Sequence, residues 1–336
     1  MSAISIENLR RHFQARTGGI FRRTTKEVHA LRGIDLEVQP GSLFGLLGPN
    51  GAGKTTTVKI LTTLLLPSSG TVRIHGIDVA ADPQGVRKHI GYAFGGEKGF
   101  YDRLSARDNL RFFADLYQLP VREQSRRVDE LLELVNLSER STDRVETYSR
   151  GMKQRLHIAR SLLHDPSVVF LDEPTNGLDP VAARNLRAAV VQLRDAGKTV
   201  LLTTHYMFEA EELCDRLAVI DQGQILVQGT ARDLAAAAES GVVARVETRG
   251  ANPSLCDALS QLPSVVDASL EFLTDRELLT VRTSLAAPEA AEATVRKALE
   301  AAADTDLLHL SLREPTLEDT YVTLVSQGAT GARERT

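Results

Sequence analysis

The sequence predicts an α/β protein whose main sheet is mostly parallel, followed by a smaller α+β domain. Two short, largely apolar segments, Val168–Leu171 and Thr199–Thr203, are typical of strands that helices cover on both faces. A helix pattern at Val181–Ala196 lies between them. Ser42–Leu47 predicts a third buried strand, and a helix pattern from Thr55 to Leu66 follows it. Such alternation of strands and helices favours a parallel sheet.

Three further strands are predicted in the first part of the chain. Alternating apolar residues indicate strands at Ile4–Leu9, Leu31–Val38 and Val72–His75. A basic, glycine-containing insertion at 14–28 separates the first two. This insertion either lies near anionic lipid head groups or forms a solvated hairpin tip.

The chain divides into a large and a small domain. Helical spacing from Ser105 to Arg140 predicts a helical subdomain at about 100–160 within a first domain at 1–234. An alanine-rich stretch at 235–241 is interpreted as a linker, and the polar residues 327–336 as a flexible tail.

The second domain, 242–326, has the element order β-α-β-β-α-β, which is typical of a split βαβ, ferredoxin-like sandwich. A last helix is expected at Leu317–Val325. The other elements are predicted at Val242–Thr248, Asn252–Gln261, Val265–Phe272, Leu278–Thr283, Pro288–Ala303 and Leu307–Leu312.

Composition excludes several classes of protein. With 336 residues, the chain is longer than one core usually serves. Lys and Arg number 40 against 44 Asp and Glu, a net charge of −4, so we expect no nucleic-acid partner. No apolar run approaches the roughly 20 residues of a membrane-spanning helix. Two cysteines, Cys214 and Cys256, provide no disulfide framework, and a cytosolic protein is expected.

A glycine-rich sequence after the Ser42–Leu47 strand predicts a phosphate-binding loop. Its glycines let backbone N–H groups curve round a phosphate, and the following helix N-terminus adds partial positive charge. Lys54 would reach the β- and γ-phosphates, and the Thr55 hydroxyl would bind Mg²⁺. The alternative is a glycine-rich turn that arose by chance. The candidate ATP-binding residues here are Gly48, Pro49, Asn50, Gly51, Ala52, Gly53, Lys54, Thr55 and Thr56.

Two carboxylates follow the strand Val168–Leu171. Asp172 suits the Mg²⁺ shell, and Glu173 is positioned to act as a general base toward an attacking water. His205 ends the next apolar strand, and parallel pairing would bring it to the same sheet edge as Glu173. The alternatives are a solvated acidic pair and a structural histidine.

Tyr148, Ser149, Arg150, Gly151 and Met152 precede a long helix pattern, in which Ser149 also reads as an N-cap. With this segment the chain resembles the nucleotide-binding subunits of ATP-binding-cassette (ABC) transporters, from residue 4 to about 230. The resemblance implies a P-loop NTPase cassette with a RecA-like core, an antiparallel β subdomain and a helical subdomain. It also implies ATP and Mg²⁺ as cofactors.

The resemblance assigns further roles. Ser149 and Gly151, within the signature 149–152, would contact the γ-phosphate held by a second copy of the chain or a homologous ATPase. Asp179 would communicate between the two sites of that dimer. Phe13 would stack on adenine, although Phe21 is an alternative ring.

Three less specific sequence phrases, Leu61–Gly70, Tyr148–Arg155 and Pro315–Asp319, resemble those of ATPases of ABC-2 type exporters. Such ATPases include those for daunorubicin and doxorubicin resistance and for sodium efflux. This resemblance implies a separate ABC-2 transmembrane permease, a peripheral location on the cytoplasmic face of the cell membrane, and efflux of a drug, lipid or ion. The alternatives are a soluble ABC ATPase that acts on ribosomes or DNA, and a P-loop kinase or GTPase.

One segment departs from the family pattern. Glycine stands in Ile90–Gly99 where the family usually has a glutamine that touches Mg²⁺. Glu97 is a candidate metal ligand in its place, or a water substitutes, or Glu97 and Lys98 are only a solvated pair. The aromatic residues in Gly99–Leu104 suit either docking of a permease helix or local core packing.

Overall fold

A computed structural model describes residues 2–17, 24–94, 99–238, 241–301 and 305–324. It divides the chain into two compact units, Met1–Gln228 and Gly229–Thr336. Each unit has a hydrophobic core of its own.

The first unit is built on a six-stranded sheet with the order β10-β9-β3-β8-β7-β6. Strand β3 pairs in parallel with β8 and β9, and β7 pairs in parallel with β6 and β8. The predicted parallel sheet is therefore confirmed, and the carboxyl ends of β3, β7 and β8 meet at one edge. The strands are β3 (Leu43–Leu47), β6 (Ile90–Phe94), β7 (Val168–Asp172), β8 (Thr199–Thr204), β9 (Arg216–Asp221) and β10 (Gln224–Gly229).

Helices α1 (Lys54–Leu61), α6 (Pro180–Asp195) and α7 (Met207–Leu213) follow β3, β7 and β8 respectively. Helix α1 ends at Leu61, five residues before the predicted end. The reason is local: Thr63 takes a left-handed conformation with φ of 61°, and the N–H of Leu64 closes back on the Lys59 carbonyl.

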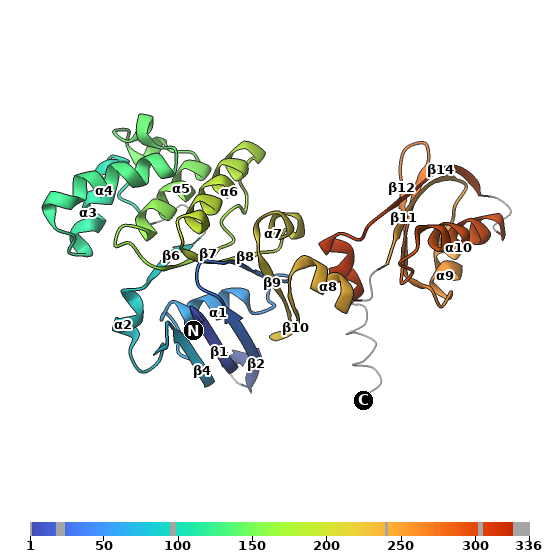
Figure 1. Ribbon diagram of the computed structural model, residues 1–336, viewed down its shortest axis with the longest axis horizontal. Helices are drawn as coiled ribbons and strands as arrows, with labels where there is room; N and C mark the ends of the chain where they lie inside the picture. The colour runs from blue at the N-terminus through green and yellow to red at the C-terminus, as the bar shows by residue number, and fades with distance from the viewer. Residues whose placement is uncertain (1, 18–23, 95–98, 239–240, 302–304, 325–336) are drawn as a thin grey trace. The chain divides into compact units, whose positions relative to one another are not determined.

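An antiparallel sheet of order β2-β1-β4-β5 lies at the opposite end of this unit from the helices α3 to α6 (Figure 1). Its strands are β1 (Ile4–Thr17), β2 (Thr24–Val38), β4 (Ser69–Ile74) and β5 (Ile77–Asp78), and the short helix α2 (Pro83–Arg87) follows.

The first two strands are longer than the sequence predicted. Pairing continues to Thr17 opposite Thr24, so most of the 14–28 insertion is hairpin. Register shifts after Ile6 and after Arg11 interrupt the alternation of apolar residues in β1. An alternating pattern therefore does not identify the full length of this strand.

Three helices form the helical subdomain. They are α3 (Ala106–Leu116), α4 (Val121–Leu134) and α5 (Arg150–Ser161), with 3₁₀ turns η1 (Ser138–Arg140) and η2 (Val145–Thr147) between the last two. Their shared core contains the fully buried side chains of Leu110, Val128 and Leu156. Ser105 caps α3 by accepting from the N–H of Asp108 at 3.0 Å, which fixes where the subdomain's first helix begins.

The second unit has the predicted β-α-β-β-α-β order. Its antiparallel sheet runs β12-β13-β11-β14, which is the arrangement of a split βαβ fold, so that fold class is confirmed. The elements are β11 (Val243–Arg249), α9 (Pro253–Ser260), β12 (Val265–Phe272), β13 (Glu277–Thr283), α10 (Pro288–Ala301) and β14 (Asp306–Arg313).

A helix occupies the start of the predicted linker. Helix α8 spans Ala231–Ala237 and begins with a capping box, in which Thr230 and Asp233 each accept from the other's backbone N–H. The unit boundary falls before it, after Gln228. The predicted linker at 235–241 therefore starts inside a helix, because its alanines are strong helix formers.

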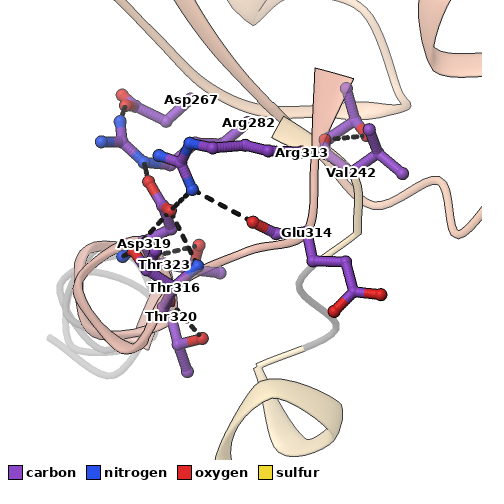
Figure 2. A network of polar contacts seen from close by, with 10 residues as sticks. Val242, Asp267, Arg282, Arg313, Glu314, Thr316, Asp319, Thr320 and Thr323 are labelled. Carbon is purple, nitrogen blue, oxygen red and sulfur yellow. Dashed lines mark hydrogen bonds and ion pairs between the residues drawn. The ribbon is translucent and has the colours of Figure 1, made fainter. Parts of the chain in front are cut away.

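A buried carboxylate holds the last described helix, 317–324, in place (Figure 2). Asp319 accepts from Arg282 at 2.9 Å and from Arg313 at 2.5 Å, and Thr316 donates to it through both N–H and hydroxyl. Burial alone raises the pKa of Asp319, but the Arg313 and Thr316 contacts outweigh it and lower the pKa to about 2. The Pro315–Asp319 phrase is thus a helix cap tied to two strands.

Candidate active site

The phosphate-binding loop runs from the end of β3 to the start of α1, as predicted. Two of its glycines have no room for a side chain. A Cβ at Gly48 would lie 2.1 Å from the Ile220 carbonyl oxygen, and one at Gly53, whose φ is 118°, would lie 2.9 Å from the Ala30 oxygen. The loop backbone is therefore packed tightly on its inner side, while Asn50 and Thr55 are exposed. This is the geometry of a cradle for an anion at a helix N-terminus.

Lys54 is buried at the centre of this loop, with 4% of its surface exposed. Its ammonium donates to the carbonyl oxygens of Gly48 at 2.7 Å and Pro49 at 3.1 Å. The same Nζ lies 3.3 Å from Oε1 of Glu173. The loop thus fixes one positive charge beside the carboxylate that follows β7.

Two oxygen donors suited to a hard cation lie side by side. The Oγ1 of Thr55 is 3.4 Å from Oδ1 of Asp172. Thr203, on the neighbouring strand β8, donates to the same Oδ1 at 2.6 Å and orients it. A hydroxyl and a carboxylate at the mouth of a phosphate loop fit Mg²⁺, which prefers oxygen ligands and keeps several waters.

Glu173 stands at the sheet edge in an uncommon conformation. Its φ is 47°, and its N–H donates to the Thr203 backbone and hydroxyl oxygens at 3.1 and 3.0 Å. Its Oε2 accepts from the Asn176 side chain at 3.2 Å. A non-glycine residue in this region of φ is held there by its surroundings, so the carboxylate is directed rather than free.

His205 reaches the same carboxylate from the end of β8. Its Nδ1 lies 3.4 Å from Oε1 of Glu173. The predicted convergence of the two strand ends is therefore seen: Lys54 and His205 each lie within 3.4 Å of the same Glu173 oxygen. A carboxylate with an ammonium and an imidazole beside it is an arrangement that can position and deprotonate a water.

The signature segment opens α5. Ser149 is its N-cap and accepts from the N–H of Met152 at 3.3 Å. Gly151 faces α6, where a Cβ would lie 2.8 Å from that of Ala182. Among the described residues, no hydrogen bond or ion pair joins the segment 149–152 to Lys54 or Glu173.

Asp179 caps α6, accepting from the N–H groups of Val181 at 3.0 Å and Ala182 at 2.9 Å. Arg150 packs beside Gly177, where a Cβ would lie 2.3 Å from the guanidinium. The signature segment and the segment before α6 are thus neighbours in one chain. Both segments therefore lie on the same part of the first unit.

The aromatic candidates differ. Phe13 lies on β1 opposite Val28, is 37% exposed, and has the Arg11 guanidinium 4.6 Å from its ring centre. Its ring is therefore available for stacking on one face. Phe21 and the candidate metal ligand Glu97 lie outside the described residues.

Sequence reasoning overlooked Thr203 and Glu209. Thr203 donates to the Asp172 carboxylate and accepts from the Glu173 backbone N–H, and Glu209 on α7 accepts from Thr175 and Thr204 at 2.9 Å each. Thr203 is the last residue of the predicted strand Thr199–Thr203, so the sequence indicated its position at the sheet edge. Its contacts depend on strand register and could not be predicted.

A pocket of about 660 Å³ adjoins the side-chain oxygens of Thr55 and Asp172. Thr55 and Asp172 form part of its wall, and apolar side chains form much of the rest. Burial and the nearby Asp172 raise the pKa of Tyr92 in this wall to about 12, so its phenol stays neutral. The other lining residues are Lys59, Thr62, Leu64, Arg87, Ile90, Phe94, Tyr117 and Arg160.

The described residues contain neither a membrane-spanning helix nor a cluster of metal-ligating side chains. No helix there is both long and apolar enough to cross a membrane. No cluster of three or more histidine, cysteine, aspartate or glutamate side chains there could hold a metal ion.

Comparison with known proteins gives consistent results. Residues 31–176 match the family described as ABC transporter. The linearmycin resistance ATP-binding protein LnrL of Bacillus subtilis is 34% identical over 298 residues, 88% of this chain and 94% of that protein. The daunorubicin resistance ATP-binding protein DrrA3 of Streptomyces coeruleorubidus is 40% identical, over 88% of this chain and 90% of that protein.

Among solved structures, cbiO1 of Clostridium perfringens, part of the ABC transporter complex cbiONQ, aligns with a TM-score of 0.60 and 28% identity. The alignment covers 70% of this chain and 91% of the cbiO1 chain. A nearly full-length relative and the arrangement of loop, carboxylates and imidazole lead to one conclusion: the chain belongs to the ABC transporter family, as an ATP-binding subunit that hydrolyses ATP.

Proposed function

We propose that this chain energises an ABC-2 type exporter that moves a drug, lipid or ion across the cell membrane. Relatives named for resistance to daunorubicin and linearmycin support the direction of transport. The observation that carries the catalytic part is the contact of Lys54 and His205 with one oxygen of Glu173, at 3.3 and 3.4 Å.

We assign a role in ATP hydrolysis to each residue of the site. The loop 48–53 and Lys54 bind the phosphates of ATP, and Thr55 and Asp172 hold Mg²⁺. Bound Mg²⁺ supplies positive charge to the phosphate oxygens. Glu173 accepts a proton from the attacking water, and His205 holds the carboxylate and water in line.

A second ATPase subunit completes the site. Ser149 and Gly151 would contact the nucleotide held by another copy of this chain or by a homologous subunit, and Asp179 would lie near the joint between them. The support is that Ser149 and Arg150 are exposed at the start of α5. Phe13 would stack on the adenine of its own chain's nucleotide.

The permease would dock at the pocket beside β6 and at exposed aromatic residues of the helical subdomain. Among these, Tyr101 is in edge contact with Phe112, their ring centres 4.9 Å apart. Because Thr55 and Asp172 form part of the same pocket wall, a helix seated there would feel changes at the cation site. The subunit would then lie on the cytoplasmic face of the membrane.

The test is Glu173→Gln. This change keeps the side chain's size but removes the base, so ATP affinity should be retained and turnover should fall by roughly 10²- to 10⁴-fold. With Mg-ATP the variant should form a stable dimer, which sedimentation measures. Glu212→Gln, an exposed carboxylate on α7 paired with Arg187, is the matched control.

Purification partners test the transport part. Tagged Glu173→Gln protein with Mg-ATP should retain a multi-span membrane protein in stoichiometric amount from solubilised membranes. Ribosomes or DNA in its place would overturn the exporter proposal. Hydrolysis at the wild-type rate would instead overturn the role of Glu173.

A further inference from the structure

Glu209 is a buried carboxylate that the proposed mechanism does not use. It lies in α7, is 3% exposed, and its Oε1 is buried with no hydrogen-bond partner in the part of the chain that the structure describes. Burial raises its pKa, since the charged form loses water, while bonds from Thr175 and Thr204 act in the opposite direction. Burying a carboxylate costs free energy of folding unless hydrogen bonds compensate it. The groups that bond to Glu209 therefore indicate its function.

One contact reaches the strand end that carries His205. Thr204, directly before His205, donates its hydroxyl to Oε2 of Glu209 at 2.9 Å. The same hydroxyl accepts from the N–H of Tyr206 at 3.0 Å. The chain is therefore fixed on both sides of His205.

The other contact reaches the segment that carries Glu173. Thr175, two residues after Glu173, donates its hydroxyl to the same Oε2 at 2.9 Å. The Thr175 carbonyl accepts from the N–H of Leu178 at 3.1 Å, within the turn that leads to α6. Oε2 of Glu209 thus joins the loop after β7 to the turn after β8.

We propose that Glu209 is a positioning residue for ATP hydrolysis, which holds the Glu173 loop and the His205 turn at the separation that their 3.4 Å contact requires. This inference rests on the proposed roles of Glu173 and His205. Glu209 itself acts only through Thr175 and Thr204. Small displacements of reacting groups reduce turnover strongly, which gives such an anchor a measurable effect.

Two substitutions separate anchoring from charge. Glu209→Gln keeps an acceptor oxygen for both threonines and places its amide where Oε1 has no partner. Glu209→Ala removes the acceptor and leaves two buried hydroxyls without it. We expect the alanine variant to lose roughly 10- to 100-fold in kcat per ATP-binding site, with ATP affinity within about twofold of wild type. The glutamine variant should recover kcat to within about threefold.

Counting ATP-binding sites in each preparation keeps the test valid if part of the alanine variant misfolds. Glu212→Ala, on the exposed side of the same helix, is the control for changes to α7 and should keep wild-type kcat. Thr175→Val provides a milder second variant. It should lower kcat alone but add no further loss to Glu209→Ala, because both remove the same link.

Three results would overturn the positioning role: unchanged kcat per site in Glu209→Ala, a parallel fall in ATP affinity, or a glutamine variant as defective as alanine. The Glu173→Gln variant is measured in the same assay. If it hydrolyses ATP normally, the proposed catalytic base is wrong. If it is inactive while Glu209→Ala is normal, only the positioning role fails.

Discussion

The ammonium of Lys54 lies among three oxygens, two from loop carbonyls and one from Glu173. A buried cation needs such partners, and phosphate oxygens are the natural ones for a lysine at this position. The side chain, at the start of α1, is thus directed into the loop rather than to solvent. We predict that Lys54 contributes to binding and Glu173 to turnover.

Replacement of Lys54 by alanine should therefore weaken ATP binding. The loss of charge-assisted hydrogen bonds costs about 1.5–3 kcal/mol, which corresponds to a roughly 10- to 100-fold higher Kd. Equilibrium binding of ATP measures it. Lys59→Ala, one turn further along α1 and exposed, is the control. Equal affinities of Lys54→Ala and wild type would contradict the binding role.

Gly151 is predicted to be required for packing as well as for any contact with nucleotide. A Cβ there would lie 2.8 Å from the Cβ of Ala182, and both atoms are attached to helix backbones. Gly151→Ala should lower the free energy of unfolding by about 1–3 kcal/mol in urea titrations, since α5 and α6 must separate. The same change in an Ala182→Gly background should cost clearly less.

For individual residues, the sequence predicted those that belong to motifs of residues adjacent in the chain. Lys54, Asp172 and Glu173 were found because loop spacing and strand ends identify them without knowledge of the fold. Glu209 was missed because its partners, Thr175 and Thr204, come together only through the pairing of β7 with β8. The left-handed φ of Glu173 had no signal in the sequence either.

Among the elements, helix 317–324 depends on the charge of Asp319. Its pKa of about 2 is below the ordinary 3.8, so ionised Asp319 stabilises the folded state above the unfolded pKa, and this stability is lost as the pH falls toward 2. The shift corresponds to about 2 kcal/mol.

Asp319→Asn should therefore destabilise the protein by about 2 kcal/mol at pH 6 and by less at pH 3. Urea unfolding at the two pH values measures the difference. Glu318→Gln, an exposed neighbour in the same helix, should show neither effect. A cost for Asp319→Asn that is equal at both pH values would exclude ionisation as its source.

Element prediction succeeded where apolar period and length agreed. The small domain's four strands and two helices follow the predicted order because each has one clear apolar face. The β1–β2 hairpin was underestimated, since its outer part is polar and its register shifts break the alternation. The last three residues of helix α8 were assigned to the predicted linker 235–241 because alanine suits both, and the helix's capping box, Thr230 with Asp233, was the signal that distinguishes them.

For the whole molecule, two compact units predict two unfolding transitions. The proposed ATP-binding residues all lie in the first unit, Met1–Gln228. In calorimetry of Glu173→Gln protein, Mg-ATP at about 100 times its Kd adds about 2.7 kcal/mol of stability, which shifts one transition by roughly 5–10 °C and leaves the other in place. At the same ATP concentration, the Lys54→Ala protein, with its roughly 10- to 100-fold higher Kd, should gain only about 0.4–1.4 kcal/mol and show a correspondingly smaller shift. Equal shifts of both transitions would mean that the units unfold together.

The register around Val243 limits how this chain can be recombined with its relatives. Val243 is the pairing partner of both Arg282 on β13 and Arg313 on β14, so the two guanidinium groups project from one row, with backbones about 10 Å apart. Asp319 forms an ion pair with each of them, and Asp267 on β12 also pairs with Arg282. A chimaera with its junction between β14 and helix 317–324 would inherit both arginines and lose the carboxylate that they share, so that only Asp267, beside Arg282, would remain. The exchangeable module therefore includes that helix, and a transplanted sheet needs it to remain folded.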